Sequence, residues 1–147
     1  ASQKLVDFVR SKANGFIFTT SLPPAVAAAA TASVRHVRDQ GQERREQHQE
    51  RTKTLKELLT DAGLPIMPSD SHIVPIMVGD PILCKQVTDD LMSRYGIYVQ
   101  PINHPTVPKG TERLRLTPSP IHSDEDMAEL VKALTEIWSR LALKWAA

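Results

Sequence analysis

The stretch of residues 103–120 constrains this chain more than any other. It contains four prolines, at positions 105, 108, 118 and 120, and each proline fixes φ and removes a backbone donor. Between them the sequence Glu-Arg-Leu-Arg-Leu-Thr alternates, which predicts a short strand with Arg113, Arg115 and Thr117 on one face. Arginine grips a carboxylate or phosphate with two parallel hydrogen bonds. The pattern therefore fits a ligand site, and it equally fits two surface arginines that pair with nearby acids.

The C-terminal half alternates strand-like and helix-like patterns. Residues 73–78 predict a strand, and residues 80–95 predict a helix that starts with an Asp-Pro N-terminus and ends at Gly96. Further strands are predicted at residues 97–102 and 113–117. A last helix begins at Ser123 with Asp126 as its capping-box partner. Its apolar stripe is typical of a core, and consists of Met127, Leu130, Val131, Leu134, Ile137, Trp138 and Leu141. We expect a small α+β domain with helices on one face of a three-stranded sheet.

The N-terminal segment combines a helix with a cluster of hydroxyl groups. Residues 2–12 have helical spacing, residues 16–18 predict a strand or extended piece, and Thr19, Thr20 and Ser21 precede an alanine-rich helix. The free amide groups and the dipole of a helix N-terminus favour an anion. The alternative is that Ser21 only caps the helix and the threonines satisfy local backbone groups.

The middle of the chain is helical and largely polar. Residues 38–54 have no apolar side chain, which predicts a helix that is solvated or that bridges between domains. Acids interleave with the arginines, so a nucleic-acid-binding helix is a poor alternative. Apolar residues return from Leu55, and Gly63 ends the helix. We expect His36 and His48 on the surface, and His72 in a packing or hydrogen-bonding role.

Composition excludes several classes of function. The formal net charge of +1 gives no reason to expect a nucleic acid or an anionic membrane as partner. No apolar run is long enough to span a bilayer, so we expect a soluble protein. Cys84 is the single cysteine and is expected to be a structural thiol in a reduced compartment. The sequence has no metal-ligand cluster, glycine-rich phosphate loop or nucleophilic triad.

Three separated motifs carry a family resemblance. They are residues 15–24 (Gly-Phe-Ile-Phe-Thr-Thr-Ser-Leu-Pro-Pro), residues 71–75 (Ser-His-Ile-Val-Pro), and residues 98–103 (Tyr-Val-Gln-Pro-Ile-Asn), which run into Pro105-Thr106-Val107-Pro108. With these motifs, nearly the whole chain resembles the C-terminal part of the α-oxoamine synthases, enzymes that use pyridoxal phosphate (PLP). His104 departs from the aromatic residue expected there, which concerns only the packing of that loop.

The resemblance implies an architecture. Residues 1–24 would end the large cofactor domain of a fold-type I PLP-dependent transferase, residues 25–63 would be linking helices, and residues 64–147 would be its small C-terminal domain. In this family the sheet of the small domain is mainly antiparallel. The chain would then be the C-terminal third of a larger enzyme.

The resemblance also implies a site. Thr19 and Thr20 would contact the cofactor phosphate from the neighbouring subunit of a homodimer. Arg115 would bind the carboxylate of glycine, and Thr106 would meet the carboxylate of succinyl-CoA. Arg113 is expected to form a structural ion pair instead. Threonine at position 106 favours the 5-aminolevulinate synthase branch, which condenses glycine with succinyl-CoA at the start of haem biosynthesis.

The family holds PLP on a lysine that precedes the motif at residues 15–24. Lys4 and Lys12 do not match that lysine's motif, so this chain alone would be inactive and would need the N-terminal part of the enzyme. The expected compartment is the bacterial cytoplasm or the mitochondrial matrix. The alternatives are 2-amino-3-ketobutyrate CoA ligase, 8-amino-7-oxononanoate synthase, and a non-catalytic α+β interaction domain.

Overall fold

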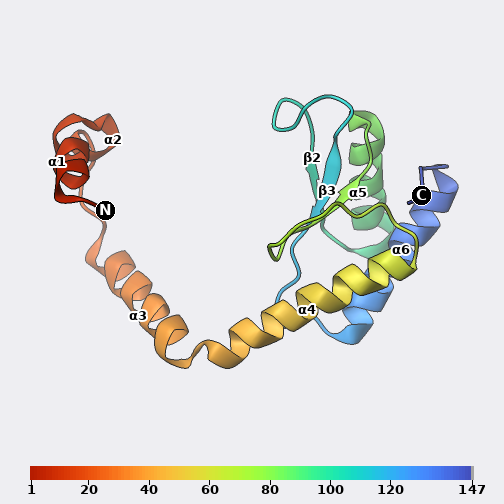
Figure 1. The fold of residues 1–147 in the computed structure, drawn as a ribbon, viewed down its shortest axis with the longest axis horizontal. Coiled ribbons are helices and arrows are strands. Elements are labelled where there is room, and N and C mark those ends of the chain that lie inside the picture. The colour runs from red at the N-terminus through yellow and green to blue at the C-terminus, as the bar shows by residue number, and fades with distance from the viewer. Residues whose placement is uncertain (147) are drawn as a thin grey trace. The chain divides into compact units, whose positions relative to one another are not determined.

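A computed structural model describes residues 1–146 and divides them into two compact units. The first unit is Ala1–Gln42, and the second begins at Glu43. The second unit contains the hydrophobic core and the sheet of the molecule, and each unit is described by itself below (Figure 1).

The first unit consists of helices α1 (Gln3–Lys12), α2 (Asn14–Ile17) and α3 (Pro24–Gln40). Ser2 caps α1 by accepting a hydrogen bond from the amide of Leu5, as the polar residue before a helix often does. The expectation of a strand at residues 16–18 is wrong, because the apolar run forms the end of α2 instead. A short apolar run fits either structure. None of the residues in these three helices is buried.

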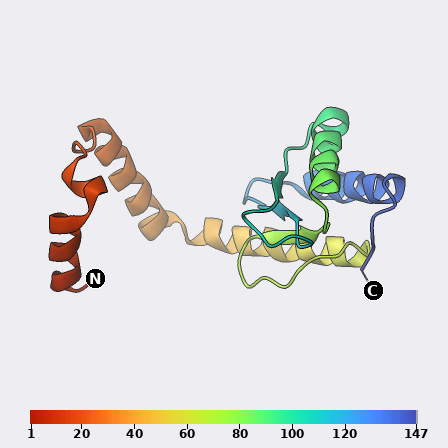
Figure 2. The same ribbon diagram turned by 90° about the horizontal axis from the view of Figure 1, so that it is seen from above.

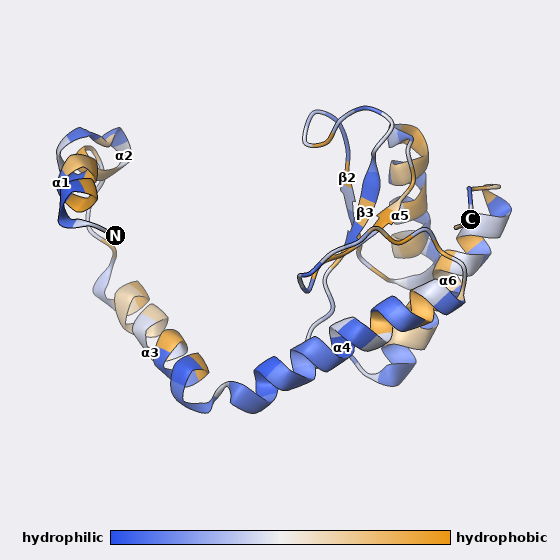
Figure 3. Ribbon diagram, viewed as in Figure 1, coloured by the Kyte–Doolittle hydropathy of each residue, from blue (hydrophilic) through white to orange (hydrophobic). Residues whose placement is uncertain are grey.

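Helix α4 (Gln42–Asp61) changes character along its length, as Figure 3 shows. Its first half is hydrophilic, whereas Thr52, Leu55 and Leu59 are buried in the second unit. Gly63 ends the helix with φ +73°, and the amide of Leu64 donates to the carbonyl of Leu59. This positive φ is the conformation in which glycine has no side-chain clash.

The sheet consists of β1 (Val74–Met77), β2 (Gln100–Ile102) and β3 (Arg113–Leu116) in the order β1-β3-β2. Both pairings are antiparallel, which agrees with the expected strand direction. The register places Arg115 between Pro75 and Gln100. Side chains that alternate with Arg115 along β1 and β3 are buried, and these are Val74, Ile76, Leu114 and Leu116. One face of the sheet therefore covers the core, while Arg115 lies on the other.

Helices α5 (Pro81–Tyr95) and α6 (Asp124–Arg140) pack against each other, and α5 contacts β2 and β3 (Figures 1 and 2). Asp80 caps α5 through the amides of Ile82 and Leu83, and Gly96 ends it in the left-handed conformation. The predicted capping box of Ser123 and Asp126 is present at the start of α6.

The core joins α4, the buried face of the sheet, α5 and α6. The predicted apolar stripe of α6 faces it: Trp138, Leu134 and Ile137 are fully buried, and Leu130, Val131 and Leu141 pack around its margin. The expected α+β fold with an antiparallel three-stranded sheet is confirmed. The division at residues 24 and 63 stays a prediction.

Candidate functional site

Arg115 is exposed on the open face of β3 and lines a cavity of about 570 Å³. Strand β3 positions it from the centre of the sheet, between β1 and β2, where the backbone is held on both sides. Tyr98 and Gln100 line the same cavity and are joined by a hydrogen bond of 2.6 Å from the phenol to the amide oxygen. A guanidinium on a rigid strand beside a cavity is suited to bind an anionic group.

The cavity also contains negative and titratable side chains from α6 and from the turn before it. Asp126 and Glu129 of α6, and His122 of the turn, line it together with Arg115. The pKa of Asp126 is lowered because its carboxylate accepts a hydrogen bond from the backbone amide of Ser123. The cavity thus presents charges of both signs, with Arg115 on the sheet side and the carboxylates on the helix side.

Arg113 has a different environment. Its Nε donates to the carbonyl of Thr111 over 2.9 Å, and it does not line the cavity of Arg115. Among the residues that the structure describes, Arg113 forms no ion pair, so the expected structural ion pair is wrong.

Thr106 lies in the loop between β2 and β3, which contains a cis bond between His104 and Pro105. It is exposed, and its backbone amide donates to the carbonyl of Asn103 over 3.0 Å. Thr106 does not line the cavity that contains Arg115. The structure therefore places these two predicted substrate residues in one unit without bringing them into one cavity.

The same loop is held at its base by a buried carboxylate. Glu112 is only 1% exposed, and its Oε2 accepts from the amide of Gly110 over 2.9 Å. Its backbone carbonyl accepts from the amides of both Val78 and Gly79. At the other end, the side chain of Asn103 donates to the carbonyl of Pro81. No sequence pattern singled out Glu112, since a lone acid next to a strand is usually solvated.

Thr19 and Thr20 lie in the first unit, in the loop between α2 and α3. Both are exposed, and the hydroxyl of Thr19 is 3.5 Å from the carbonyl of Thr20. The N-cap position of α3 is Pro23, and no side chain caps the helix. The alternative in which Ser21 caps this helix is therefore wrong. The hydroxyls precede a helix N-terminus whose amides have no side-chain partner.

Two histidines that were not assigned to the site contact each other. The rings of His48 and His72 are 5.1 Å apart at an angle of 48°, which agrees with the packing role expected for His72. The expectation that His48 is a surface residue is wrong, because it is half-buried and its Nε2 is 3.0 Å from the carbonyl oxygen of Pro118. His48 contacts residues that are distant from it in the sequence, so no local sequence pattern predicts these contacts.

Cys84 is buried in α5, and its thiol donates to the carbonyl of Arg113 over 3.3 Å. Burial raises the pKa of this thiol to about 11. The side chain is thus a neutral core group, as expected.

The described part of the chain has neither a metal-binding cluster nor a membrane-spanning helix. Within residues 1–146, no group of three or more histidine, cysteine, aspartate or glutamate side chains is placed to hold a metal ion. No helix in the described part of the chain is both long enough and apolar enough to cross a membrane.

Known proteins similar to this chain agree on its family. The family model of aminotransferase class I and II matches residues 1–134. A 5-aminolevulinate synthase of Rhizobium meliloti is 58% identical over 97% of this chain and 35% of its own length. An erythroid-specific, mitochondrial 5-aminolevulinate synthase of Bos taurus is 52% identical over 97% of the chain and 24% of its own length. The chain thus spans about a third or less of these curated relatives.

A solved structure has the same fold. Serine palmitoyltransferase from S. paucimobilis with a bound PLP-myriocin aldimine superposes with a TM-score of 0.82 and 28% identity, over 92% of this chain and 34% of that one. Since the family model also matches most of the sequence, the chain belongs to the aminotransferase class I and II family, and the curated relatives described above are 5-aminolevulinate synthases.

Proposed function

We propose that this chain is part of a 5-aminolevulinate synthase, which condenses glycine with succinyl-CoA to give 5-aminolevulinate, CoA and carbon dioxide. The observation that carries the proposal is Arg115, a guanidinium on a central strand beside a cavity of about 570 Å³. The high identity to 5-aminolevulinate synthases of two organisms supports this branch over the other acyl-CoA transferases of the fold.

The residues in the first unit fit a cofactor with a phosphate group. Thr19 and Thr20 expose two hydroxyls in the loop that leads to α3, and the first amides of that helix have no side-chain cap. A phosphate group accepts hydrogen bonds from hydroxyls and from free helix amides. The cofactor of the proposed reaction is PLP, which supplies an electron sink for the carbanion of glycine.

The residues of this chain would bind and orient the two substrates. Arg115 would hold the carboxylate of glycine with two parallel hydrogen bonds, which fixes the direction of the amino acid. The hydroxyl of Thr106 would donate to the far carboxylate of the succinyl group. Orientation of this kind lowers the activation free energy because the reacting groups are already held in the reactive geometry.

Replacement of Arg115 tests the proposal. In the complete enzyme, Arg115→Lys retains the charge but not the two-point contact, so glycine binding should weaken by roughly 1.5–3 kcal/mol. The measurement is KM and kcat for glycine at saturating succinyl-CoA, with Arg113→Lys as the matched control, because Arg113 does not line the cavity. Unchanged glycine kinetics in Arg115→Ala would contradict the assignment.

We further propose that Thr19 and Thr20 serve the neighbouring subunit of a homodimer. A subunit altered at both threonines, paired with one that lacks the PLP-binding lysine, should then regenerate one intact site per heterodimer. Recovered activity in verified heterodimers is the measurement. Its complete absence would mean that the threonines serve their own subunit.

The chain alone should lack synthase activity, because neither Lys4 nor Lys12 matches the motif of the PLP-binding lysine. Addition of PLP and borohydride to the chain, followed by mass analysis, should find no stoichiometric adduct on one lysine. The expected compartment is the bacterial cytoplasm or the mitochondrial matrix, as for the mitochondrial relative of Bos taurus. Cell fractionation with an antibody against this chain would check it.

A further inference from the structure

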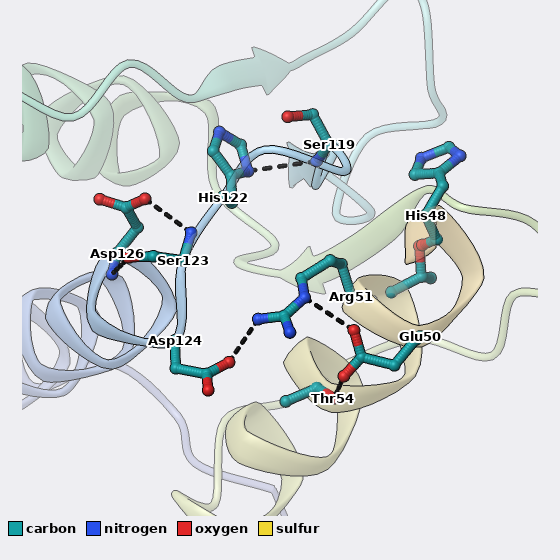
Figure 4. Close-up of polar contacts among 10 residues, drawn as sticks. His48, Glu50, Arg51, Thr54, Ser119, His122, Ser123, Asp124 and Asp126 are labelled. Atoms are coloured by element: carbon teal, nitrogen blue, oxygen red, sulfur yellow. Dashed lines mark hydrogen bonds and ion pairs between the residues drawn. The ribbon is translucent and has the colours of Figure 1, made fainter. Parts of the chain in front are cut away.

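The segment that follows Arg115 forms hydrogen bonds with two histidines, His48 from α4 and His122 from the same turn. Pro118 and Ser119 come three and four residues after Arg115, at the point where β3 ends and the chain turns toward α6. Figure 4 shows His48 on α4, and His122 beside Ser119.

His48 contacts Pro118 through its Nε2 atom, which is 3.0 Å from the carbonyl oxygen. A carbonyl oxygen can only accept, so Nε2 must carry the proton. His48 is half-buried and Pro118 is buried. The ring of His48 is further packed against His72. This hydrogen bond therefore joins α4 to the end of β3 in a place that is partly shielded from water.

His122 contacts Ser119 in the opposite sense. The backbone amide of Ser119 donates to Nδ1 of His122 over 3.1 Å, so Nδ1 carries no proton. The backbone amide of His122 donates in turn to the carbonyl of Ser119 over 3.2 Å, which closes the turn. His122 also lines the cavity that contains Arg115.

An ion pair joins α4, which bears His48, to the first turn of α6, which follows the turn that contains His122. Arg51 of α4, one turn after His48, contacts the carboxylate of Asp124 in the first turn of α6 (Figure 4). The guanidinium of Arg51 also meets Glu50, at 2.7 Å. The turn after β3 is therefore bonded to α4 through His48, and His122 forms a local hydrogen bond within the turn itself.

We propose that His48 and His122 are positioning residues for Arg115, which fix the end of β3 so that its guanidinium meets the amino-acid carboxylate. The inference rests on the proposed function of Arg115. Neither histidine needs to touch the substrate. Each acts through the backbone of Pro118 or Ser119, and a shift there is transmitted along the strand over three or four residues.

The test uses paired substitutions in the complete, PLP-loaded enzyme. His48→Gln retains a donor near the position of Nε2, and His122→Asn retains an acceptor near the position of Nδ1, whereas the two alanine variants retain neither. The matched control is Tyr95→Phe, which removes one hydrogen bond of 2.6 Å between α5 and α6 and lies outside the Arg115 cavity.

Each alanine variant should raise the KM for glycine by about fivefold, the scale of one lost hydrogen bond, while the KM for succinyl-CoA stays unchanged. The Gln and Asn variants should stay near the parent at pH 8. Tyr95→Phe should lower the melting temperature without changing either KM.

Alanine variants with unchanged glycine KM would overturn the proposal, as would Asn or Gln variants that behave like alanine. Equal changes in the KM of both substrates would also overturn it, because they would indicate a general structural role. A separate readout needs neither substrate nor cofactor: hydrogen exchange at the Ser119 amide of this chain, measured by NMR. Protection in the parent and in His122→Asn, and its loss in His122→Ala, is the expected result.

The two readouts separate the two proposals. If the parent enzyme does not use glycine, the proposed function fails, while Ser119 protection still reports whether His122 holds the turn. If the parent uses glycine and Ser119 is equally exposed in all variants, the proposed function stands and the positioning role is wrong.

Discussion

Individual residues of the candidate site differ in what holds them. Arg115 is held by a strand that pairs on both sides, whereas Thr106 depends on a loop. That loop is anchored at its base by the buried carboxylate of Glu112 and near its start by the side chain of Asn103. A carboxylate buried to this extent costs free energy unless it is hydrogen-bonded, and the amide of Gly110 provides such a bond. The anchors make Thr106 a residue with a defined position.

Substitution of Thr106 should change the choice of acyl-CoA in the complete enzyme. Thr106→Val keeps the volume and removes the hydroxyl, so an enzyme that hydrogen-bonds the succinyl carboxylate should lose turnover with succinyl-CoA. Turnover with butyryl-CoA, which has no terminal carboxylate, should stay unchanged. The measurement is the ratio of kcat/KM for the two substrates, which should fall by about tenfold. A constant ratio would remove the physical basis for preferring the 5-aminolevulinate synthase branch.

The thiol of Cys84 should react slowly in the folded chain. Its pKa is raised to about 11 by burial, so at pH 8 the thiolate that attacks a disulfide reagent is scarce. Reaction with such a reagent should be much slower in buffer than in concentrated urea, where the thiol is exposed and its pKa returns toward the ordinary value. Equal rates in the two solutions would show that Cys84 is accessible in the folded state.

At the scale of elements, α6 contains its own start signal and its own core-facing stripe. Ser123 accepts from the amide of Asp126, and Asp126 accepts from the amide of Ser123. Both bonds satisfy amides that have no partner within the helix. The stripe centred on Trp138 then packs the helix into the core, against α5. The candidate cavity depends on this helix because its first turns form one wall.

Loss of the cap should destabilise the second unit. Ser123→Ala removes the side-chain acceptor and should lower the free energy of unfolding by about 1 kcal/mol. Ser139→Ala, an equal change at an exposed position near the end of the same helix, should have little effect or a slightly favourable one. Urea unfolding followed by circular dichroism measures both. Equal losses in the two variants would show that the cap does not contribute.

The contribution of Asp126 should depend on pH. Its folded pKa lies below the ordinary value of 3.8 because its carboxylate accepts from Ser123. The unfolded chain therefore binds a proton more readily than the folded chain, and the stabilisation is present above the unfolded pKa and is lost as the pH falls through the folded pKa. The destabilisation caused by Asp126→Asn at pH 7 should thus shrink at pH 2 to 3. A difference that does not change with pH would contradict this.

At the scale of the whole molecule, the two units differ in how they are stabilised. The helices of the first unit bury none of their residues, and several large apolar side chains there are exposed, with Phe18 at 84%. The second unit has a continuous core that includes α4, α5, α6 and the sheet. Buried apolar area is the main source of folding stability. The stability of this chain should therefore come from the second unit.

Removal of residues 1–42 tests this expectation. Residues 43–147 should retain a cooperative thermal transition within a few degrees of that of the whole chain, because the residues removed contribute no buried helix side chains. Calorimetry of the two chains is the measurement. Limited proteolysis of the whole chain should likewise cut first within residues 1–42. A shortened chain without a cooperative transition would show that the core needs the first unit.

Much of the fold could be predicted from the sequence by itself, because its signals are local. The cap at Asp80, the left-handed end at Gly96 and the capping box at Ser123 each depend on residues within a few positions of one another, and the structure contains all three. Alternation along residues 113–117 likewise predicted which side chains of β3 share a face. For the site, the sequence pattern identified Arg115 as a candidate residue. The family resemblance added Thr106, Thr19 and Thr20.

Only the tertiary structure decided which of these residues share a cavity, because that depends on contacts between distant segments. In the structure, Thr106 does not line the Arg115 cavity, and Arg113 is hydrogen-bonded to a backbone carbonyl. Residues 16–18, expected as a strand, form the end of a helix. The tertiary structure also buried Glu112 and brought His48 to Pro118. A polar side chain has the same local sequence whether it is solvated or bonded to a chain segment seventy residues away, so its partner is set by the packing of the elements and not by its neighbours.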